Sequence, residues 1–268
     1  YWVWYSSVPL GLLIHFAQNN PREIENYYSR LLYPEVFDLH QFFLNYIPFP
    51  FGDIMYIVLF IYGLKIVLER ISFWKSKPLQ FLFDFGSAVI ISGWIFHLSW
   101  GFNYHRIPLN EQLAIKVNYS KQDLEERLDK LINESNHWHD QLVISDTLAV
   151  EFPLSKDQTL EKVSLYSPFY NETLLNHTKV KKSLLSLPLS YMGYSGYLNP
   201  FTLESQINGK MPPISQITTS FHEAAHQLGY ANEKEAQAAN GGAYPPDMSV
   251  LAKARSGGVD YLYSCLLY

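Results

Sequence analysis

The chain has 268 residues, a formal net charge of −5 and no run of basic residues, which excludes the charge pattern of a nucleic-acid-binding protein. Hydrophobic residues make up 48% of the chain and charged residues only 17%, which favours a membrane region joined to a modest soluble domain. The single cysteine, Cys265, excludes an intrachain disulfide framework and the CxxCH motif that attaches a c-type haem.

Three apolar stretches occupy the N-terminal part of the chain. They cover residues 1–17, 54–68 and 79–100, and each approaches the roughly 20 residues that a helix needs to cross a bilayer. The first begins abruptly, as if the chain starts inside a spanning helix, and it lacks the basic leader of a signal peptide. Buried core helices of a soluble protein are the alternative, but the stretches lie close together and aromatic residues crowd their ends. We therefore predict a membrane region over residues 1–103 with three transmembrane helices.

Basic residues indicate how this region is oriented. Arg70, Lys75 and Lys77 lie in the short connection between the second and third stretches, whereas the longer first loop carries only Arg22 and Arg30. Cytoplasmic loops are enriched in lysine and arginine. We therefore expect the short connection in the cytoplasm and everything after residue 103 on the outer face of the membrane.

Two further polar features admit more than one interpretation. Asp84 lies within the third stretch, where an ionisable residue is either functional or, near the start of a span, an interfacial structural residue. His137 and His139 flank Trp138, but at this spacing they point to different faces of a helix. We therefore expect solvated surface histidines here rather than metal ligands.

The composition after residue 103 is that of an ordinary water-soluble domain, which we place at residues 104–236. Ser120 followed by Asp123 is typical of a capped helix start. The expected elements are a helix over 120–142, a strand or extended chain over 141–152, an amphipathic helix over 171–187, and one or two strands near a turn over 188–205.

The segment HEAAH, residues 222–226, is a candidate zinc site. Residues four apart share one face of a helix, so His222 and His226 can present two imidazoles to one ion while Glu223 lies beside them. A catalytic zinc site uses three protein ligands and leaves a fourth position for water, whose proton a neighbouring carboxylate can take as general base. A surface helix that carries the pattern by chance is the alternative. The preceding Thr218, Thr219 or Ser220 offers an N-cap for the motif helix.

The third ligand is harder to assign. On a straight helix Glu233 would lie about 10 Å beyond His226, so the chain must turn, and Gly229 can supply the turn. The metzincin pattern would put the third ligand at Asn232, a poor zinc ligand, which leaves Glu233 and Glu235. We favour Glu233, because the spacing E-K-E-A-Q resembles the ExxxD helix of glutamate-zincins. Either carboxylate could instead be a solvated surface charge.

Three segments carry a family resemblance: WGFNYHRIPL, SYMGYSGYLNPFT and above all TTSFHEAAHQLGYANEKEA. Together with the apolar stretches, they resemble a bacterial membrane-protein family of unknown function, DUF3810, over residues 1–236. The resemblance implies an inner-membrane protein with an outward-facing zincin-like domain and metallopeptidase chemistry. His222, Glu223 and His226 match the family's motif directly.

The chain departs from that pattern after Ala236. Residues 237–268, with NGGAYPPD and KARSGGVDY, resemble a segment of the membrane-anchored c-type cytochrome of the bc-type respiratory complex. The abrupt change indicates a fusion or an incorrectly joined tail. Because CxxCH is absent, we expect no haem on this chain, and association with a respiratory complex only if the tail is genuine.

These observations predict an α+β chain in which three transmembrane helices precede a zincin-like metallopeptidase domain. We expect one Zn²⁺ on His222, His226 and Glu233, with Glu223 as the catalytic base in the hydrolysis of a peptide or protein substrate. The expected location is the bacterial inner membrane, multi-pass in the lipid bilayer, with the catalytic domain on the periplasmic side. The alternatives are a non-catalytic membrane scaffold with a vestigial or structural metal site and, from the tail alone, a fragment of an electron-transfer cytochrome.

Overall fold

The computed structural model describes residues 2–112, 120–142, 158 and 179–233. The described residues fall into two compact units. One contains residues 2–107, 158 and 179–233, and the other contains residues 108–112 and 120–142. The described chain is mostly helical with one small sheet, so the expected mixture of helix and strand is confirmed at that level.

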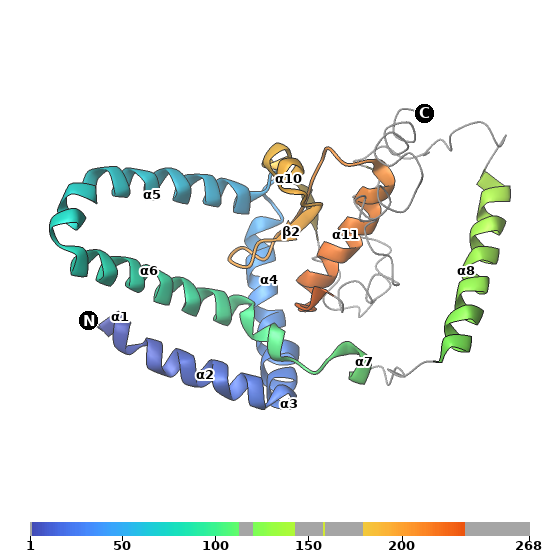
Figure 1. Ribbon diagram of the computed structural model, residues 1–268, viewed down its shortest axis with the longest axis horizontal. Coiled ribbons are helices and arrows are strands. Elements are labelled where there is room, and N and C mark those ends of the chain that lie inside the picture. Colours follow the sequence, from blue (N-terminus) through green and yellow to red (C-terminus); the bar gives the residue numbers. More distant parts are fainter. Residues whose placement is uncertain (1, 113–119, 143–157, 159–178, 234–268) are drawn as a thin grey trace. The chain divides into compact units, whose positions relative to one another are not determined.

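Two long apolar helices form a hairpin in the first unit (Figure 1). Helix α5 (Phe51–Ser76) has 26 residues and helix α6 (Pro78–Ser99) has 22, and both are long and apolar enough to cross a membrane. In their most apolar windows only 11% of α5 and 0% of α6 is buried. The second and third predicted stretches are therefore helices of spanning length whose apolar side chains point outward.

The first predicted stretch forms two shorter helices, α1 (Trp2–Tyr5) and α2 (Ser7–Asn19), separated at Ser6. They run beside α6: the Trp4 indole donates to the carbonyl of Phe83 at 3.3 Å, and the Trp94 indole donates to that of Ser6 at 3.2 Å. With 13 residues, α2 is shorter than a bilayer requires. Among the described residues, two helices rather than the three expected have the length of a span.

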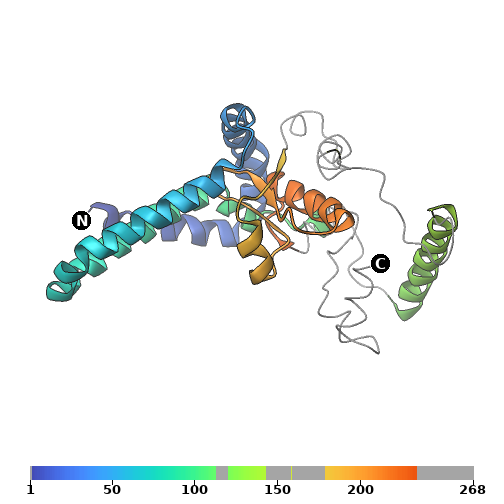
Figure 2. The same cartoon turned by 90° about the horizontal axis from the view of Figure 1, so that it is seen from above.

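A helical segment runs across the ends of α5 and α6 rather than alongside them (Figures 1 and 2). It comprises α3 (Pro21–Glu23), the π-helix η1 (Ile24–Leu32) and α4 (Tyr33–Leu44). The 3₁₀-helix η2 (Gly101–His105) follows α6 and packs against η1. Tyr33 and Phe37 on the inner face of α4 join the main hydrophobic core with Trp100, Phe102 and Leu203.

Asp84 has structural partners at the turn between α5 and α6. Its carboxylate accepts hydrogen bonds from the Trp74 indole at 3.1 Å and from Gln80 at 2.9 Å, and it lies 3.7 Å from Arg70. These contacts join the end of α5 to the start of α6. They favour the structural alternative for this residue over a functional site within the span.

The small sheet has the strand order β1-β3-β2. Strand β1 (Val180–Lys182) pairs parallel with β3 (Ser205–Ile207), and β2 (Gly196–Leu198) pairs antiparallel with β3. Helix α10 (Ser186–Met192) lies between β1 and β2 in the chain, and α11 (Pro213–Gln227) packs on the sheet.

Two sequence predictions concern the residues of this sheet. The helix predicted over 171–187 is wrong for residues 180–182, which form a strand that pairs with β3, whereas residues 186 and 187 are helical as the start of α10. Strands near a turn were predicted over 188–205. That is right for β2 and for the start of β3, but residues 188–192 belong to α10. The extended segment predicted over 141–152 lies outside the described residues, apart from the end of the preceding helix.

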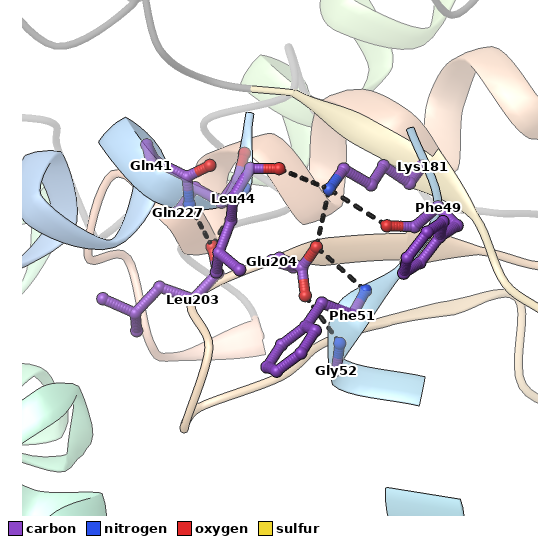
Figure 3. Close-up of polar contacts among 9 residues, drawn as sticks. All are labelled: Gln41, Leu44, Phe49, Phe51, Gly52, Lys181, Leu203, Glu204 and Gln227. Atoms are coloured by element: carbon purple, nitrogen blue, oxygen red, sulfur yellow. Dashed lines mark hydrogen bonds and ion pairs between the residues drawn. The ribbon is translucent and has the colours of Figure 1, made fainter. Parts of the chain in front are cut away.

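A buried ion pair ties the sheet to the start of α5 (Figure 3). The ammonium of Lys181 contacts the Glu204 carboxylate at 2.7 Å and donates to the carbonyls of Leu44 at 3.0 Å and Phe49 at 3.3 Å. The Glu204 carboxylate in turn accepts hydrogen bonds from the first backbone amides of α5, that of Phe51 at 3.2 Å and that of Gly52 at 2.6 Å. A carboxylate at a helix N-terminus satisfies amides that have no partner inside the helix. The sheet and α5 are therefore joined by charge-assisted hydrogen bonds.

The second unit contains α7 (Leu109–Gln112) and α8 (Lys121–Leu142). The predicted start of α8 is confirmed: the Ser120 amide donates to Asp123 at 2.7 Å and the Asp123 amide donates to the Ser120 hydroxyl at 3.1 Å. The Ser120 hydroxyl also donates to the Asp123 carboxylate at 2.7 Å, and the hydrogen bonds from the amide and the hydroxyl of Ser120 lower the pKa of Asp123. His137 is exposed and lies 3.1 Å from the Gln141 amide, as expected of a solvated surface residue, and the side chain of His139 lies outside the description.

Candidate metal centre

Helix α11 carries the HEAAH segment and begins earlier than the sequence indicated. Pro212 is the N-cap and Pro213 the first helical residue, a position where proline lacks only an amide that would be unpaired anyway. The predicted N-caps Thr218, Thr219 and Ser220 therefore lie inside the helix, and that prediction is wrong. The Ser220 hydroxyl bonds instead to the carbonyl of Gln216 at 2.6 Å.

His222 and His226 lie one turn apart and are both buried, with ring centroids separated by 4.7 Å. Nδ1 of His226 lies 2.7 Å from the carbonyl of Tyr230. Because a carbonyl only accepts hydrogen bonds, this contact places a proton on Nδ1, so that the neutral imidazole has its lone pair on Nε2. Metal-binding histidines are oriented in this way by an acceptor behind the ring.

The chain reverses after α11 at Gly229, as predicted. Gly229 has a φ of +83°, in the left-handed region that favours glycine. Its amide donates to the carbonyl of His226 at 2.9 Å, and the Tyr230 amide donates to that of Ala225 at 3.2 Å. A Cβ at position 229 would also come within 3.1 Å of the Asn103 side chain. This turn directs the following residues back toward the histidines.

Glu233 lies beside both imidazoles. One carboxylate oxygen is 3.0 Å from Nε2 of His222 and the other is 3.7 Å from Nε2 of His226. One ligand atom from each of the three residues lies within 4.8 Å of the others. Ligands about 2.0–2.1 Å from a tetrahedral zinc ion are about 3.3 Å apart, and the 3.0 and 3.7 Å separations between the Glu233 oxygens and the two imidazoles lie on either side of that value. Glu235, the alternative ligand, lies outside the described residues.

Glu223 lies on the inner side of α11. It is buried, and its Oε2 has no hydrogen-bond partner within the described part of the chain. Burial raises its pKa to about 7, although the neighbouring His226 and His222 act in the opposite direction. A Cβ at Gly196 of β2 would come within 2.9 Å of Oε1, so only glycine leaves room for Glu223 here. Sequence reasoning missed Gly196, because nothing local connects it with α11.

The three candidate ligands are electrostatically coupled. Burial disfavours the charged form of His226, but the Glu233 carboxylate, 3.7 Å from its Nε2, and the charge of Glu223 outweigh this and raise its pKa. The hydrogen bond with His222 and the neighbouring imidazole of His226 hold the pKa of Glu233 well below its ordinary value. Without a metal, Glu233 is therefore an anion, while His226 holds a proton more tightly than an ordinary histidine.

Residues from the N-terminal part of the chain hold the end of α11. The Trp100 indole donates to the carbonyl of His226 at 3.2 Å, and the Tyr33 hydroxyl donates to that of Gln227 at 2.7 Å. Arg106 donates to the carbonyls of Leu228 at 3.4 Å and Gly229 at 3.2 Å. Four consecutive carbonyls, from residue 226 to residue 229, thus have donors outside the helix. The last carbonyls of a helix have no partner within it, so these contacts fix the turn that places Glu233.

Arg106 is itself anchored to η1. Its guanidinium makes two hydrogen bonds to the Glu25 carboxylate, at 2.8 and 2.9 Å, and lies over the Tyr230 ring at 4.8 Å. Burial opposes ionisation of Glu25, but Arg106 and Arg30 together lower its pKa. From the sequence, Trp100 is expected only among the aromatic residues that crowd the end of the third apolar stretch, and Arg106 occurs only within the family-like segment WGFNYHRIPL. Nothing in the sequence links either residue to α11.

Comparison with known proteins decides the family. Residues 28–240 match the family described as "Protein of unknown function (DUF3810)". The chain belongs to the DUF3810 family. The match includes His222, Glu223, His226 and Glu233, and also the residues that hold the end of α11. No solved structure matches this DUF3810 chain significantly.

The C-terminal part of this DUF3810 chain has a second similarity, as the sequence predicted. Residues 219–268 match the cytochrome C1 family. Over 37 residues, 14% of the chain, it is 68% identical to cytochrome c1 of Rhodospirillum rubrum and covers 14% of that protein. Over the same length it is 62% identical to the cytochrome b-c1 complex catalytic subunit of Candida albicans and covers 13% of that protein. The chain thus spans about a seventh of the length of these curated relatives.

Proposed function

We propose that this DUF3810 protein is a membrane-anchored zinc metallopeptidase, with His222, His226 and Glu233 as the metal ligands and Glu223 as the general base. One observation carries the proposal: two imidazole nitrogens and a carboxylate oxygen converge within 4.8 Å, beside a buried carboxylate with no hydrogen-bond partner on Oε2 among the described residues. Strongly perturbed acids beside a metal-ligand set are typical of catalytic sites.

The residues divide the chemistry between them. Zinc, when bound, supplies Lewis acidity and lowers the pKa of the water that it coordinates. Glu223, whose pKa burial raises to about 7 in the metal-free protein, would take a proton from the attacking water and return it to the leaving amine. Tyr230 keeps His226 in the required tautomer through its carbonyl, and Glu233 contributes negative charge.

The membrane part of the proposal rests on the exposed apolar helices. Helices α5 and α6 would cross the bacterial inner membrane, and α1 with α2, which run beside α6, would be part of a third span. The basic connection between α5 and α6 would be cytoplasmic, and the sheet with α11 would form a zincin-like domain on the periplasmic side. Burying such faces in lipid removes the cost of exposing them to water.

A non-catalytic scaffold is the second candidate function, and one contact favours it. Glu233 and His222 are 3.0 Å apart, so a hydrogen bond between them can hold the turn to α11 without a metal. The cytochrome c1 similarity gives a third candidate, an electron-transfer fragment associated with a respiratory complex. Purified protein with a haem Soret band would support that third candidate, and we expect none.

The deciding experiment compares zinc content and peptide hydrolysis in the full chain purified in detergent. The wild type should hold one zinc and cleave a mixture of quenched fluorescent peptides. Glu223→Gln should keep the zinc and lose cleavage, whereas His222→Ala should lose both. Cleavage by Glu223→Gln at the wild-type rate would refute the role of the base, and a wild type without zinc would favour the scaffold.

A further inference from the structure

Helix α4 has two contrasting faces. Its inner face carries Tyr33, Phe37 and Gln41, which are at most 2% exposed. Its outer face and the segment that leads into α5 carry large apolar side chains that are exposed to between 38% and 81%: Leu39, Phe42, Phe43, Tyr46, Phe49 and Phe51. We call these six residues the aromatic strip. Single exposed apolar residues are ordinary, but a continuous group of this kind marks an interaction surface.

The aromatic strip lies at the level where the apolar helices end. Helix α4 runs across those ends (Figures 1 and 2), and the Tyr28 hydroxyl donates to the carbonyls of His97 and Leu98, at the end of α6. Lys181 donates hydrogen bonds to the carbonyls of Leu44 and Phe49, which lie on either side of Tyr46 in the chain (Figure 3). The strip therefore continues along the chain directly into the exposed surface of α5.

A second exposed apolar group lies at the same end of α5. The Leu184 amide donates to Asp53, in the first turn of α5, at 2.6 Å, and the Tyr197 hydroxyl and the Ser183 hydroxyl bond to the same carboxylate. From this anchor the chain enters α10, around which five large apolar side chains are between 53% and 86% exposed: Leu184, Leu187, Tyr191, Met192 and Tyr194. We call this the α10 group.

We propose that the aromatic strip lies in the headgroup region of the lipid bilayer, with the α10 group beside it, so that α4 is an interfacial helix. This inference depends on the proposed membrane position of α5 and α6. A helix that crosses the ends of two spans lies in the plane of the membrane surface, and an exposed apolar face there contacts the boundary between headgroups and acyl chains. Aromatic side chains are the residues enriched at that depth. Glu35, exposed one turn before Leu39, marks the polar end of the strip.

The interfacial position has a consequence for the candidate metal centre. The inner face of α4 holds α11 through Tyr33 and Gln227, so a single helix separates the end of the motif helix from the lipid. Packed helices lie about 8–10 Å apart. The site would therefore meet peptide segments that emerge from the membrane or lie on its surface.

Fluorescence quenching tests the proposal on the full chain with Cys265→Ser, reconstituted in vesicles of phosphatidylcholine and phosphatidylglycerol. An environment-sensitive fluorophore is attached at Phe42→Cys and, one turn further, at Tyr46→Cys, so that one disturbed position does not decide the result. Leu64→Cys in the middle of α5 is the deep control, and Lys210→Cys, exposed in the turn before α11, is the aqueous control. Quenchers are iodide in water and nitroxides attached near the lipid headgroup or near the end of the acyl chain.

The labels at positions 42 and 46 should be quenched most by the headgroup nitroxide, should be shielded from iodide and should emit at shorter wavelength than the label at position 210. Iodide quenching equal to that at position 210 would overturn the proposal. Quenching by neither iodide nor lipid would also overturn it, because another protein surface would then cover the strip. A label at position 64 that is open to iodide would instead refute the membrane position of α5 on which the inference rests.

Discussion

The hydroxyl of Tyr33 donates a 2.7 Å hydrogen bond to the carbonyl of Gln227, the residue that follows His226. The two residues are 194 positions apart in the chain, and both are buried. The contact joins α4, which lies across the ends of the apolar helices, to the end of the helix that carries the candidate ligands. Trp100 and Arg106 donate further hydrogen bonds to the carbonyls of the neighbouring residues His226 and Gly229. The N-terminal helices thus orient the turn that brings Glu233 to the histidines.

Tyr33→Phe should test this contact with little change in shape. The variant leaves a buried carbonyl without its donor, which costs about 1–3 kcal/mol of stability. Loss of a group that orients metal ligands indirectly should also weaken zinc binding, by up to about tenfold. Chemical unfolding in detergent and zinc competition with a chelator measure the two effects. Tyr191→Phe, at an 86% exposed tyrosine, is the matched control and should change neither.

Arg106→Met should be among the most destabilising substitutions away from the ligands. It removes the buried partner of the Glu25 carboxylate, whose side chain is 1% exposed, and leaves the 62% exposed Arg30 paired with it. Removing one partner of a buried pair typically costs about 3–5 kcal/mol, and replacing both partners costs less. The double variant with Glu25→Gln should therefore recover part of the lost stability. Lys130→Met, which breaks a surface pair with Glu134, should cost at most about 1 kcal/mol. Equal losses of stability in Arg106→Met and Lys130→Met would contradict the expected difference between the buried pair and the surface pair.

Gly196→Ala should separate metal binding from hydrolysis. The three atoms nearest to a methyl group at this position would be the Gln206 carbonyl oxygen at 2.8 Å, a Glu223 carboxylate oxygen at 2.9 Å and the Thr219 methyl carbon at 2.9 Å. The methyl group should therefore displace the proposed base, and none of these three atoms belongs to a candidate ligand. A misplacement of about 1 Å can lower the rate about 10²-fold. Zinc content should stay at the wild-type value while peptide hydrolysis falls. Gly63→Ala, where a Cβ would meet nothing within 4 Å, should leave both unchanged.

The third ligand can be assigned by comparing two carboxylates in the same segment. Glu233→Ala should weaken zinc binding strongly, because it removes the only anionic donor of the proposed set, whereas Glu235→Ala should not. Equilibrium dialysis at one fixed pH gives the affinity of each variant. If Glu235→Ala weakened zinc binding more than Glu233→Ala, Glu235 would be the third ligand. The 3.0 Å contact between His222 and Glu233 would then be structural.

The features that the sequence predicted correctly share a local cause. The long apolar stretches specify α5 and α6, the spacing of His222 and His226 places both on one face of a helix, and Gly229 supplies the reversal after it. Each of these patterns is contained within a few residues or one continuous stretch. The start of α8 at Ser120 and Asp123 is local in the same sense.

The features that the sequence could not predict depend on distant parts of the chain. Trp100 meets the carbonyl of His226 across 126 positions, and Arg106 meets that of Gly229 across 123. No local periodicity connects such residues in a single sequence. The strand at 180–182 follows the same logic: its lysines and the following leucines favour a helix, but pairing with β3 and the buried contact of Lys181 with Glu204 outweigh that preference.

Zinc binding should weaken as the pH falls, because the proton competes with the metal for His226. In the metal-free protein the nearby Glu233 carboxylate and the charge of Glu223 raise the pKa of His226 above its ordinary value of about 6.5. A ligand nitrogen must be deprotonated to bind a metal, so below that raised pKa each pH unit should lower the apparent affinity about tenfold for every proton displaced. The pKa of Glu233 is lowered, so this carboxylate stays ionised and adds nothing to the slope. Glu233→Gln removes the anion that stabilises the imidazolium, so the loss of affinity in that variant should begin at a lower pH than in the wild type. Chelator competition between about pH 8 and pH 6 measures both curves, and affinity independent of pH over that range would show that His226 does not bind the metal.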